Sequence, residues 1–363
     1  MVPSPPRPHR ASCTSAPKIR IRHEGVEHAL RKERRAGTLR NVAIADYWPS
    51  GRNLKVAFVA SGGATRGLAH LGVLRACQDL GIQPEIFVGA SFGALVAAAY
   101  GQNMALDLLF DDYRWPWRQK QGPRLHLSSV LGPPTWRDFK EGRLLSGLFS
   151  IDRFERHLSR QLPVNDFRDL PYPVFVTAVD VDRCERVVFG QGYEEQVTIS
   201  KAIAASCCVP GLFRPYRIGN AYYMDGEVAH TLSVDLAIRA GADLVIISNV
   251  YQPNRRPSDG DSLARGGLLR VINQTLSILL SEKERTGVQL HQRQNPETTF
   301  IDIAPDLGSY GYFNRFATWA LMMRGYQAAT LKLAPLLRSA SLGLERTVPG
   351  TALRQLGPGT QGA

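Results

Sequence analysis

The sequence motif with the clearest chemical potential is Gly-Ala-Ser-Phe-Gly at residues 89–93. The apolar stretch before it predicts a strand and the stretch after it a helix, so Ser91 is expected in a sharp turn between them. Such a turn lifts the hydroxyl clear of the sheet, and Gly89 and Gly93 let strand and helix cross closely. The motif predicts Ser91 as the nucleophile of a nucleophile elbow; an ordinary glycine-rich turn is the alternative.

A second glycine-rich turn, Gly-Gly-Ala-Thr-Arg-Gly at residues 62–67, follows an earlier predicted strand. A turn of this kind points backbone N–H groups at an anion. Nucleoside triphosphate binding is not indicated, because Leu68 stands where a phosphate-binding loop requires lysine. Dinucleotide binding is not indicated either, because Ala64 stands where the GxGxxG fingerprint requires its second glycine. The third interpretation is an oxyanion hole, which stabilises the charge on a tetrahedral intermediate.

In this third interpretation, the preceding strand would bring the loop, with Gly62, Gly63 and Ala64, beside Ser91 at one edge of the sheet. Alanine can donate its N–H as well as glycine, provided that the φ of Ala64 is negative. Arg66 would add a positive charge to this site. The alternative for Arg66 is a helix-capping or surface residue.

A nucleophilic serine needs a base, and an aspartate is better placed for this role than the late histidines. His230 and His291 lack the loop setting that follows a strand in ordinary serine hydrolases. Asp225 directly follows a predicted strand at residues 221–224, and its carboxylate can accept the serine proton without an intervening imidazole. The sequence therefore predicts a dyad of Ser91 and Asp225.

The elements that position these residues alternate between strands and helices. Strands are expected at residues 54–60, 85–88, 174–180, 186–189, 221–224 and 244–250, and helices at 68–80, 94–100, 199–205 and 235–241. This alternation predicts a parallel sheet covered by helices on its faces. Helical patterns return at residues 268–280 and 316–337, and residues 114–145 are expected to form an insertion or loop over one end of the sheet.

The glycine loop, the Gly-x-Ser-x-Gly motif and the Asp-Gly pair, in this order, resemble the patatin-like phospholipase family. The flanking segments at residues 68–74, 205–215 and 241–246 also fit the family, and the resemblance covers residues 54–250. It implies a three-layer α/β/α fold with a mainly parallel central sheet and a helical C-terminal segment. It also implies hydrolysis of lipid acyl esters (phospholipids, lysophospholipids or glycerides) without a metal or organic cofactor.

Carried over by this resemblance, Ser91 is the nucleophile, Asp225 is the base, and Arg66 is the basic residue of the oxyanion loop. Three positions depart from the family pattern. Ala64 replaces a glycine, Glu227 replaces a glycine or alanine, and Ser233 replaces a proline. Glu227 places an extra acid beside Asp225, where it either raises the pKa of that base or faces solvent.

The chain has 363 residues and a net charge of +12, most of which lies near the N-terminus. Residues 1–55 carry twelve basic and four acidic side chains. We predict a basic, proline-rich extension at residues 1–50, a catalytic domain at 54–250, a helical part packed on the core at 251–340 and a flexible tail at 341–363. The extension is expected to contact anionic membranes peripherally rather than bind a specific nucleic acid, or simply to be solvated.

The apolar runs and the cysteines of the sequence bear on whether the protein spans a membrane and where it is located. No uncharged apolar run reaches the roughly 18 residues that a membrane span needs. The five cysteines show neither metal-ligand spacing nor a disulfide framework, so a cytoplasmic location is expected. Other functions remain open: a non-catalytic lipid-surface or regulatory protein with this fold, or an acyltransferase or thioesterase that shares the acyl-enzyme step.

Overall fold

The computed structural model describes residues 54–104, 132–133, 136–140, 142, 146–229, 232–251, 262, 268–308 and 318–341. The predicted extension at residues 1–50, most of the predicted insertion at 114–145, His230 and the tail after residue 341 lie outside this set. Within the described ranges, no helix combines the length and apolar character needed to cross a membrane.

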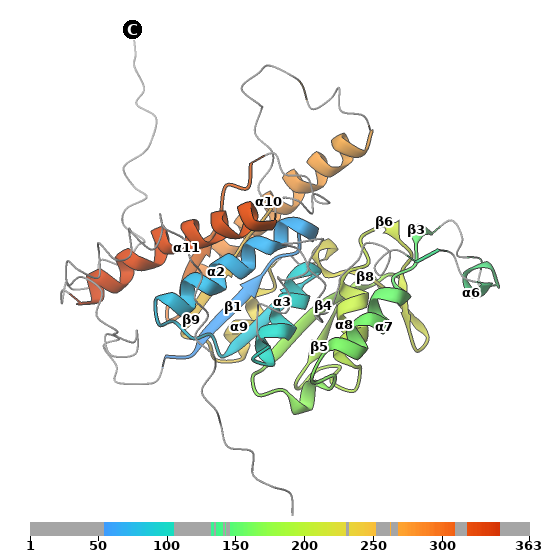
Figure 1. Cartoon of the computed structure of the whole chain (residues 1–363), viewed down its shortest axis with the longest axis horizontal. Coiled ribbons are helices and arrows are strands. Elements are labelled where there is room, and N and C mark those ends of the chain that lie inside the picture. The colour runs from blue at the N-terminus through green and yellow to red at the C-terminus, as the bar shows by residue number, and fades with distance from the viewer. Residues whose placement is uncertain are drawn as a thin grey trace, which may run out of the picture. The chain divides into compact units, whose positions relative to one another are not determined.

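A central sheet of eight strands forms the middle layer (Figure 1). Its strands are β1 (Val56–Ala60), β2 (Ile86–Ala90), β4 (Val174–Asp180), β5 (Glu185–Gly190), β7 (Tyr216–Ile218), β8 (Ala221–Asp225), β9 (Leu244–Ser248) and β10 (Thr299–Ile303). Their order is β10-β9-β1-β2-β4-β8-β7, and β5 pairs with β4 outside this path. The run from β10 to β4 is parallel, whereas β5 and β8 are antiparallel to β4. A separate pair of strands joins β3 (Gly147–Phe149) to β6 (Gly211–Phe213).

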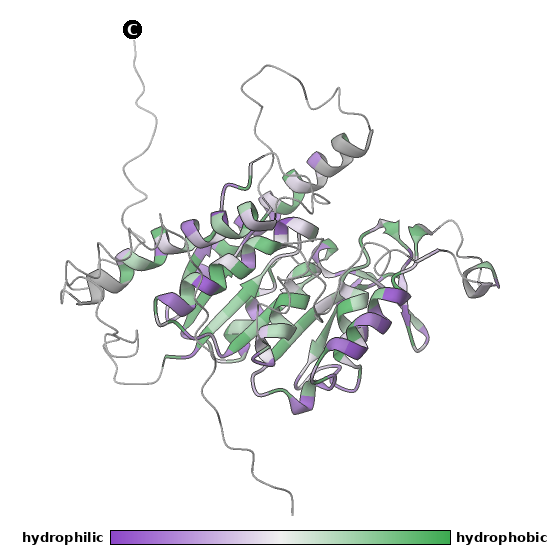
Figure 2. Cartoon of the chain, viewed as in Figure 1, coloured by the Kyte–Doolittle hydropathy of each residue, from purple (hydrophilic) through white to green (hydrophobic). Residues whose placement is uncertain are grey.

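Helices cover both faces of this sheet. The helices of the described ranges are α2 (Leu68–Asp79), α3 (Phe92–Gly101), α6 (Trp136–Lys140), α7 (Asp152–Gln161), α8 (Ile199–Ser206), α9 (Val234–Arg239), α10 (Leu268–Gln294) and α11 (Thr318–Ser341), with 3₁₀ turns η2 (Ala64–Gly67), η3 (Phe167–Asp169) and η4 (Gly226–Val228). Of these, α6 lies away from the sheet (Figure 1). Phe58 of β1 packs in one apolar cluster with α2, α3, α8 and α11, whereas Ala57 and Val59 pack in another with α9. Figure 2 shows the apolar strands between these layers. The predicted three-layer α/β/α fold with a mainly parallel sheet is confirmed.

Each strand and helix expected between residues 54 and 250 is present, with ends within two residues of the prediction. The helix expected at 268–280 continues to Gln294, and strand β10 was not predicted. β10 was missed because its sequence, Thr-Phe-Ile-Asp-Ile, is short and contains a charged residue. α7 was missed because only Phe154 and Leu158 on this polar helix are buried, which leaves a weak apolar pattern.

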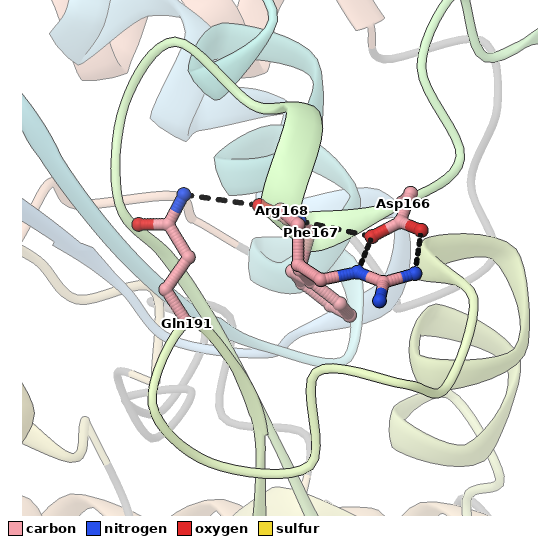
Figure 3. A network of polar contacts seen from close by, with 4 residues as sticks. All are labelled: Asp166, Phe167, Arg168 and Gln191. Atoms are coloured by element: carbon pink, nitrogen blue, oxygen red, sulfur yellow. Dashed lines mark hydrogen bonds and ion pairs between the residues drawn. The ribbon is translucent and has the colours of Figure 1, made fainter.

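A polar network fixes the segment that leads from α7 into β4 (Figure 3). Asp166 accepts bonds from Arg168 Nε at 2.9 Å and Nη2 at 2.6 Å, and this guanidinium lowers the pKa of Asp166 to about 2. Gln191, in the loop after β5, donates to the carbonyl oxygen of Phe167 at 3.0 Å. Because Phe167 is fully buried, the network ties two surface loops to the core beneath β4.

Helices α2 and α11 lie side by side and approach closely through two glycines (Figure 1). A methyl group at Gly72 of α2 would collide with the carbonyl oxygen of Met322, and one at Gly325 of α11 with that of Ala69. Each obstacle is backbone, which cannot rotate away as a side chain can. The contact therefore requires a residue without a side chain on both helices.

Candidate active site

Strand β4 brings Ser91 and Asp225 together. β2 pairs with the first half of β4 and places Ala90 opposite Thr177. β8 pairs with the second half in the opposite direction and places Asp225 opposite Ala178. Because β5 occupies the other edge of β4, β2 and β8 meet end to end along a single edge. Ser91 directly follows Ala90, so the nucleophile and base predicted from the sequence become neighbours.

Ser91 occupies a strained turn between β2 and α3. Its φ of 52° and ψ of −124° lie in a region that residues other than glycine rarely adopt. A methyl group at Gly89 would collide with the backbone of Gly93, and one at Gly93 with the carbonyl oxygen of Ala60. The two motif glycines thus have the role expected of them, because they let helix α3 start directly over the sheet.

The turn is held by a serine on a neighbouring helix. Ser91 N–H donates to Ser206 Oγ at 2.7 Å, and the Ser206 hydroxyl donates to the carbonyl oxygen of Thr177 at 2.7 Å. Both serines are buried, so each bond is shielded from water. Ser206 therefore connects α8, β4 and the strained residue.

We expect Ser206→Ala to destabilise the protein by about 1–3 kcal/mol, because it leaves the buried N–H of Ser91 without its acceptor. Relaxation of the turn should also slow any reaction at Ser91, by about tenfold. Thermal unfolding and the rate of modification of Ser91 by a fluorophosphonate would measure the two effects. Ser159→Ala, on the exposed face of α7, is the matched control. Unchanged values for Ser206→Ala would contradict a supporting role.

Asp225 is a buried carboxyl at the end of β8, only 5% exposed. Burial raises its pKa to about 6, while the N–H of Glu227 and a side-chain hydrogen bond with Ser91 lower it. The N–H of Glu227 donates to Asp225 Oδ1 at 3.1 Å. At neutral pH the carboxyl is mostly ionised yet more basic than an ordinary aspartate, as a general base requires.

His70 is the histidine nearest these motifs in the chain. Its ring makes hydrogen bonds in the buried core rather than with Ser91. Its Nδ1 contacts Ser248 Oγ at 2.7 Å and its Nε2 contacts the carbonyl oxygen of Ser61 at 2.8 Å. Burial lowers the pKa of His70 to about 4, so the ring is neutral. His70 thus links α2 to the ends of β1 and β9.

The glycine loop lies at the same edge of the sheet, directly after β1. Gly62 N–H donates to Glu227 Oε1 at 2.6 Å. Within the described residues, the N–H groups of Gly63 and Ala64 donate no hydrogen bond, as is usual at the start of a helix. The condition that Ala64 has a negative φ is not met: Ala64 has a φ of 46°, a left-handed conformation that is costly for alanine.

Two charged residues of the site are buried more deeply than the sequence indicated. Arg66 in η2 is 1% exposed, which excludes the alternative of a surface arginine. Glu227 is 2% exposed, so the alternative that it faces solvent is wrong as well. Burial and the charge of Asp225 raise the pKa of Glu227 to about 8. The charge of Asp225 therefore raises the pKa of Glu227, whereas the backbone N–H of Glu227 lowers the pKa of Asp225.

Three further residues of this site did not emerge from the sequence: Ser206, Cys207 and Tyr251. The thiol of Cys207 contacts Ser91, and burial together with the charge of Asp225 raises its pKa. The hydroxyl oxygen of Tyr251 lies where a methyl group at Gly62 would point. Tyr251 could have been found, because it closely follows a parallel strand that neighbours β1. Ser206 and Cys207 carry no comparable signal.

Metal ligation is not indicated in the described ranges, which contain no group of three or more His, Cys, Asp or Glu side chains able to hold an ion.

The chain is similar to known proteins over a large part of its length. The family model described as patatin-like phospholipase matches residues 58–238. Patatin-like phospholipase domain-containing protein 6 of Mus musculus is 26% identical over 59% of this chain and 15% of its own length. The uncharacterized NTE family protein MT2641 of Mycobacterium tuberculosis is 25% identical over 78% of this chain and 47% of its own.

A third relative, lysophospholipase nte1 of Aspergillus fumigatus, is 23% identical over 60% of this chain and 13% of its own length. The chain thus spans less than half the length of each of these relatives. The matched segment of the family model contains both glycine motifs, Ser91 and Asp225. Through residues 58–238, the chain belongs to the patatin-like phospholipase family.

Proposed function

We propose that this protein is a serine acyl hydrolase that cleaves acyl esters of lipids through Ser91 and Asp225. The observation that carries the proposal is that β4 brings Ser91, at a strained turn beside a glycine loop, next to the buried carboxyl of Asp225. Family membership supports a lipid substrate, and the names of two relatives support phospholipids or lysophospholipids in particular.

In the first half of the reaction, Ser91 Oγ attacks the ester carbonyl carbon while its proton passes to Asp225. The free N–H groups of Gly63 and Ala64 are the candidates to stabilise the negative oxygen that develops. Collapse of this intermediate breaks the bond to the alcohol portion of the lipid, which leaves with the proton from Asp225. An acyl group now occupies Ser91.

In the second half, water attacks the acyl-enzyme and gives a proton to Asp225. The second tetrahedral intermediate collapses, the fatty acid leaves, and the proton returns to Ser91 Oγ. Asp225 thus acts as base and acid in turn, and its pKa of about 6 suits both tasks near neutral pH.

A fluorophosphonate probe, which phosphonylates activated serines, tests this proposal directly. We expect labelling of the wild type and of Ser159→Ala, and none of Ser91→Ala. Release of fatty acid from lysophosphatidylcholine should follow the same pattern. Circular dichroism establishes that each variant is folded. Labelling that survives Ser91→Ala, or a folded wild type that neither labels nor releases fatty acid, would overturn the assignment.

A further inference from the structure

Glu227 is a buried acid in the site that the dyad reaction leaves without a role. Its Oε1 accepts the N–H of Gly62 at 2.6 Å, and its own N–H donates to Asp225 Oδ1 at 3.1 Å. Its Oε2 has no hydrogen-bond partner in the part of the chain that the structure describes. One residue therefore joins the glycine loop to the base.

This carboxyl also lies close to the nucleophile. A methyl group at Gly62 would stand 3.0 Å from Ser91 Cβ and 3.1 Å from Glu227 Cγ. Gly62 is thus packed between the two side chains. A shift of the loop at Gly62 would change the position of the neighbouring donors, Gly63 and Ala64, relative to Ser91.

Charged groups from two elements, β8 and α10, face Glu227. Asp225 lies on β8, Glu284 faces it from α10, and Lys283, also on α10, is partly exposed. Lys283 Nζ donates to the carbonyl oxygens of Val228 and Ala229, the two residues that follow Glu227. Burial and Asp225 raise the pKa of Glu227, whereas the N–H of Gly62 and the charge of Lys283 lower it.

We propose that Glu227 is a positioning residue that, as a neutral acid, holds the glycine loop against Ser91. The inference rests on the proposed hydrolase function. A protonated carboxyl accepts the N–H of Gly62 through its carbonyl oxygen without placing a second negative charge beside Asp225. Once ionised, it would oppose both the ionised base and the developing oxyanion, and the reaction would slow.

The rate of fluorophosphonate labelling between pH 5 and 9.5 tests this inference, because it reports on Ser91 without requiring the right lipid. For the wild type we expect a rise near pH 6, as Asp225 ionises, and a fall of about tenfold per pH unit above about pH 8. Glu227→Gln keeps the acceptor but cannot ionise, so its rate should stay level to pH 9.5. Glu227→Ala should be about 10²-fold slower than the wild type at pH 7, because the loop loses its anchor, and should also show no alkaline fall.

Glu185→Gln, an exposed substitution at the start of β5, is the matched control and should follow the wild type. A purely structural role for Glu227 would change the rate but not remove the alkaline fall. An unchanged alkaline fall in Glu227→Gln, or a wild-type rate in Glu227→Ala, would overturn the inference alone. A folded wild type that labels at no pH would instead overturn the proposed function.

Discussion

Replacement of Asp225 by asparagine is expected to lower kcat for lipid ester hydrolysis by about 10³-fold. The amide has the shape of the carboxylate and can still accept the N–H of Glu227. It cannot take the proton of Ser91, and the site offers no histidine in its place among the described residues. Acylation and deacylation should fail together, because one carboxyl serves both steps.

The same substitution should stabilise the protein at alkaline pH. The pKa of Asp225 is about 6 in the folded protein against an ordinary value of 3.8, so the folded state binds this proton more tightly than the unfolded chain. This group therefore makes the wild type less stable as the pH rises from 4 through 6, by about 3 kcal/mol in full. Asp225→Asn removes that loss.

Turnover at pH 8 and thermal unfolding at pH 4 and pH 8 would measure both effects in Asp225→Asn. Asp182→Asn, in the exposed turn after β4, is the control and should resemble the wild type in each assay. A stable but inactive Asp225→Asn protein would separate loss of the base from loss of the fold. Retained hydrolysis would mean that another group accepts the proton.

Gly72→Ala is expected to destabilise the protein strongly. The new methyl group would collide with the carbonyl oxygen of Met322, so α2 and α11 would have to separate. Overpacking of this kind costs about 3 kcal/mol, which corresponds to a fall in Tm of about 6–12 °C. Thermal unfolding followed by circular dichroism would measure it.

Gly287→Ala provides the matched control, because this glycine lies within α10 and a methyl group there would meet no atom within 4 Å. Alanine favours the helix over glycine by about 1 kcal/mol, so the control should be slightly more stable than the wild type. A Gly72→Ala protein that unfolds at the wild-type temperature would contradict the close contact between the two helices.

The sequence was sufficient to predict most of the sheet and the positions of Ser91 and Asp225 at the ends of strands, because each depends on local patterns. The Gly-x-Ser-x-Gly motif needs only its flanking strand and helix, and Asp225 needs only the end of a strand. The roles of Ser206 and Glu227 depend instead on residues far away in the chain, namely Ser91 and Gly62. A pattern of nearby residues carries no information about such partners.

The positive φ of Ala64 could not be predicted from the sequence for a different physical reason. Intrinsic preference favours a negative φ for alanine, whereas the chain here turns from β1 into η2 within a few residues. The tertiary fold imposes the turn and outweighs the local preference. The sequence likewise did not decide whether Arg66 and Glu227 are buried. Charged residues are normally exposed, and these two are buried only because the surrounding sheet and helices cover them.

The end-to-end meeting of β2 and β8 on β4 also bears on the synthesis of this protein. Ser91, the proposed nucleophile after β2, leaves the ribosome well before Asp225, the proposed base at the end of β8, and β9, which pairs with β1, follows later still. A nascent or truncated chain that stops before β8 would carry Ser91 without its proton acceptor. On the proposed mechanism such a fragment could not hydrolyse lipid esters, so activity would require synthesis at least through β8, which ends at Asp225.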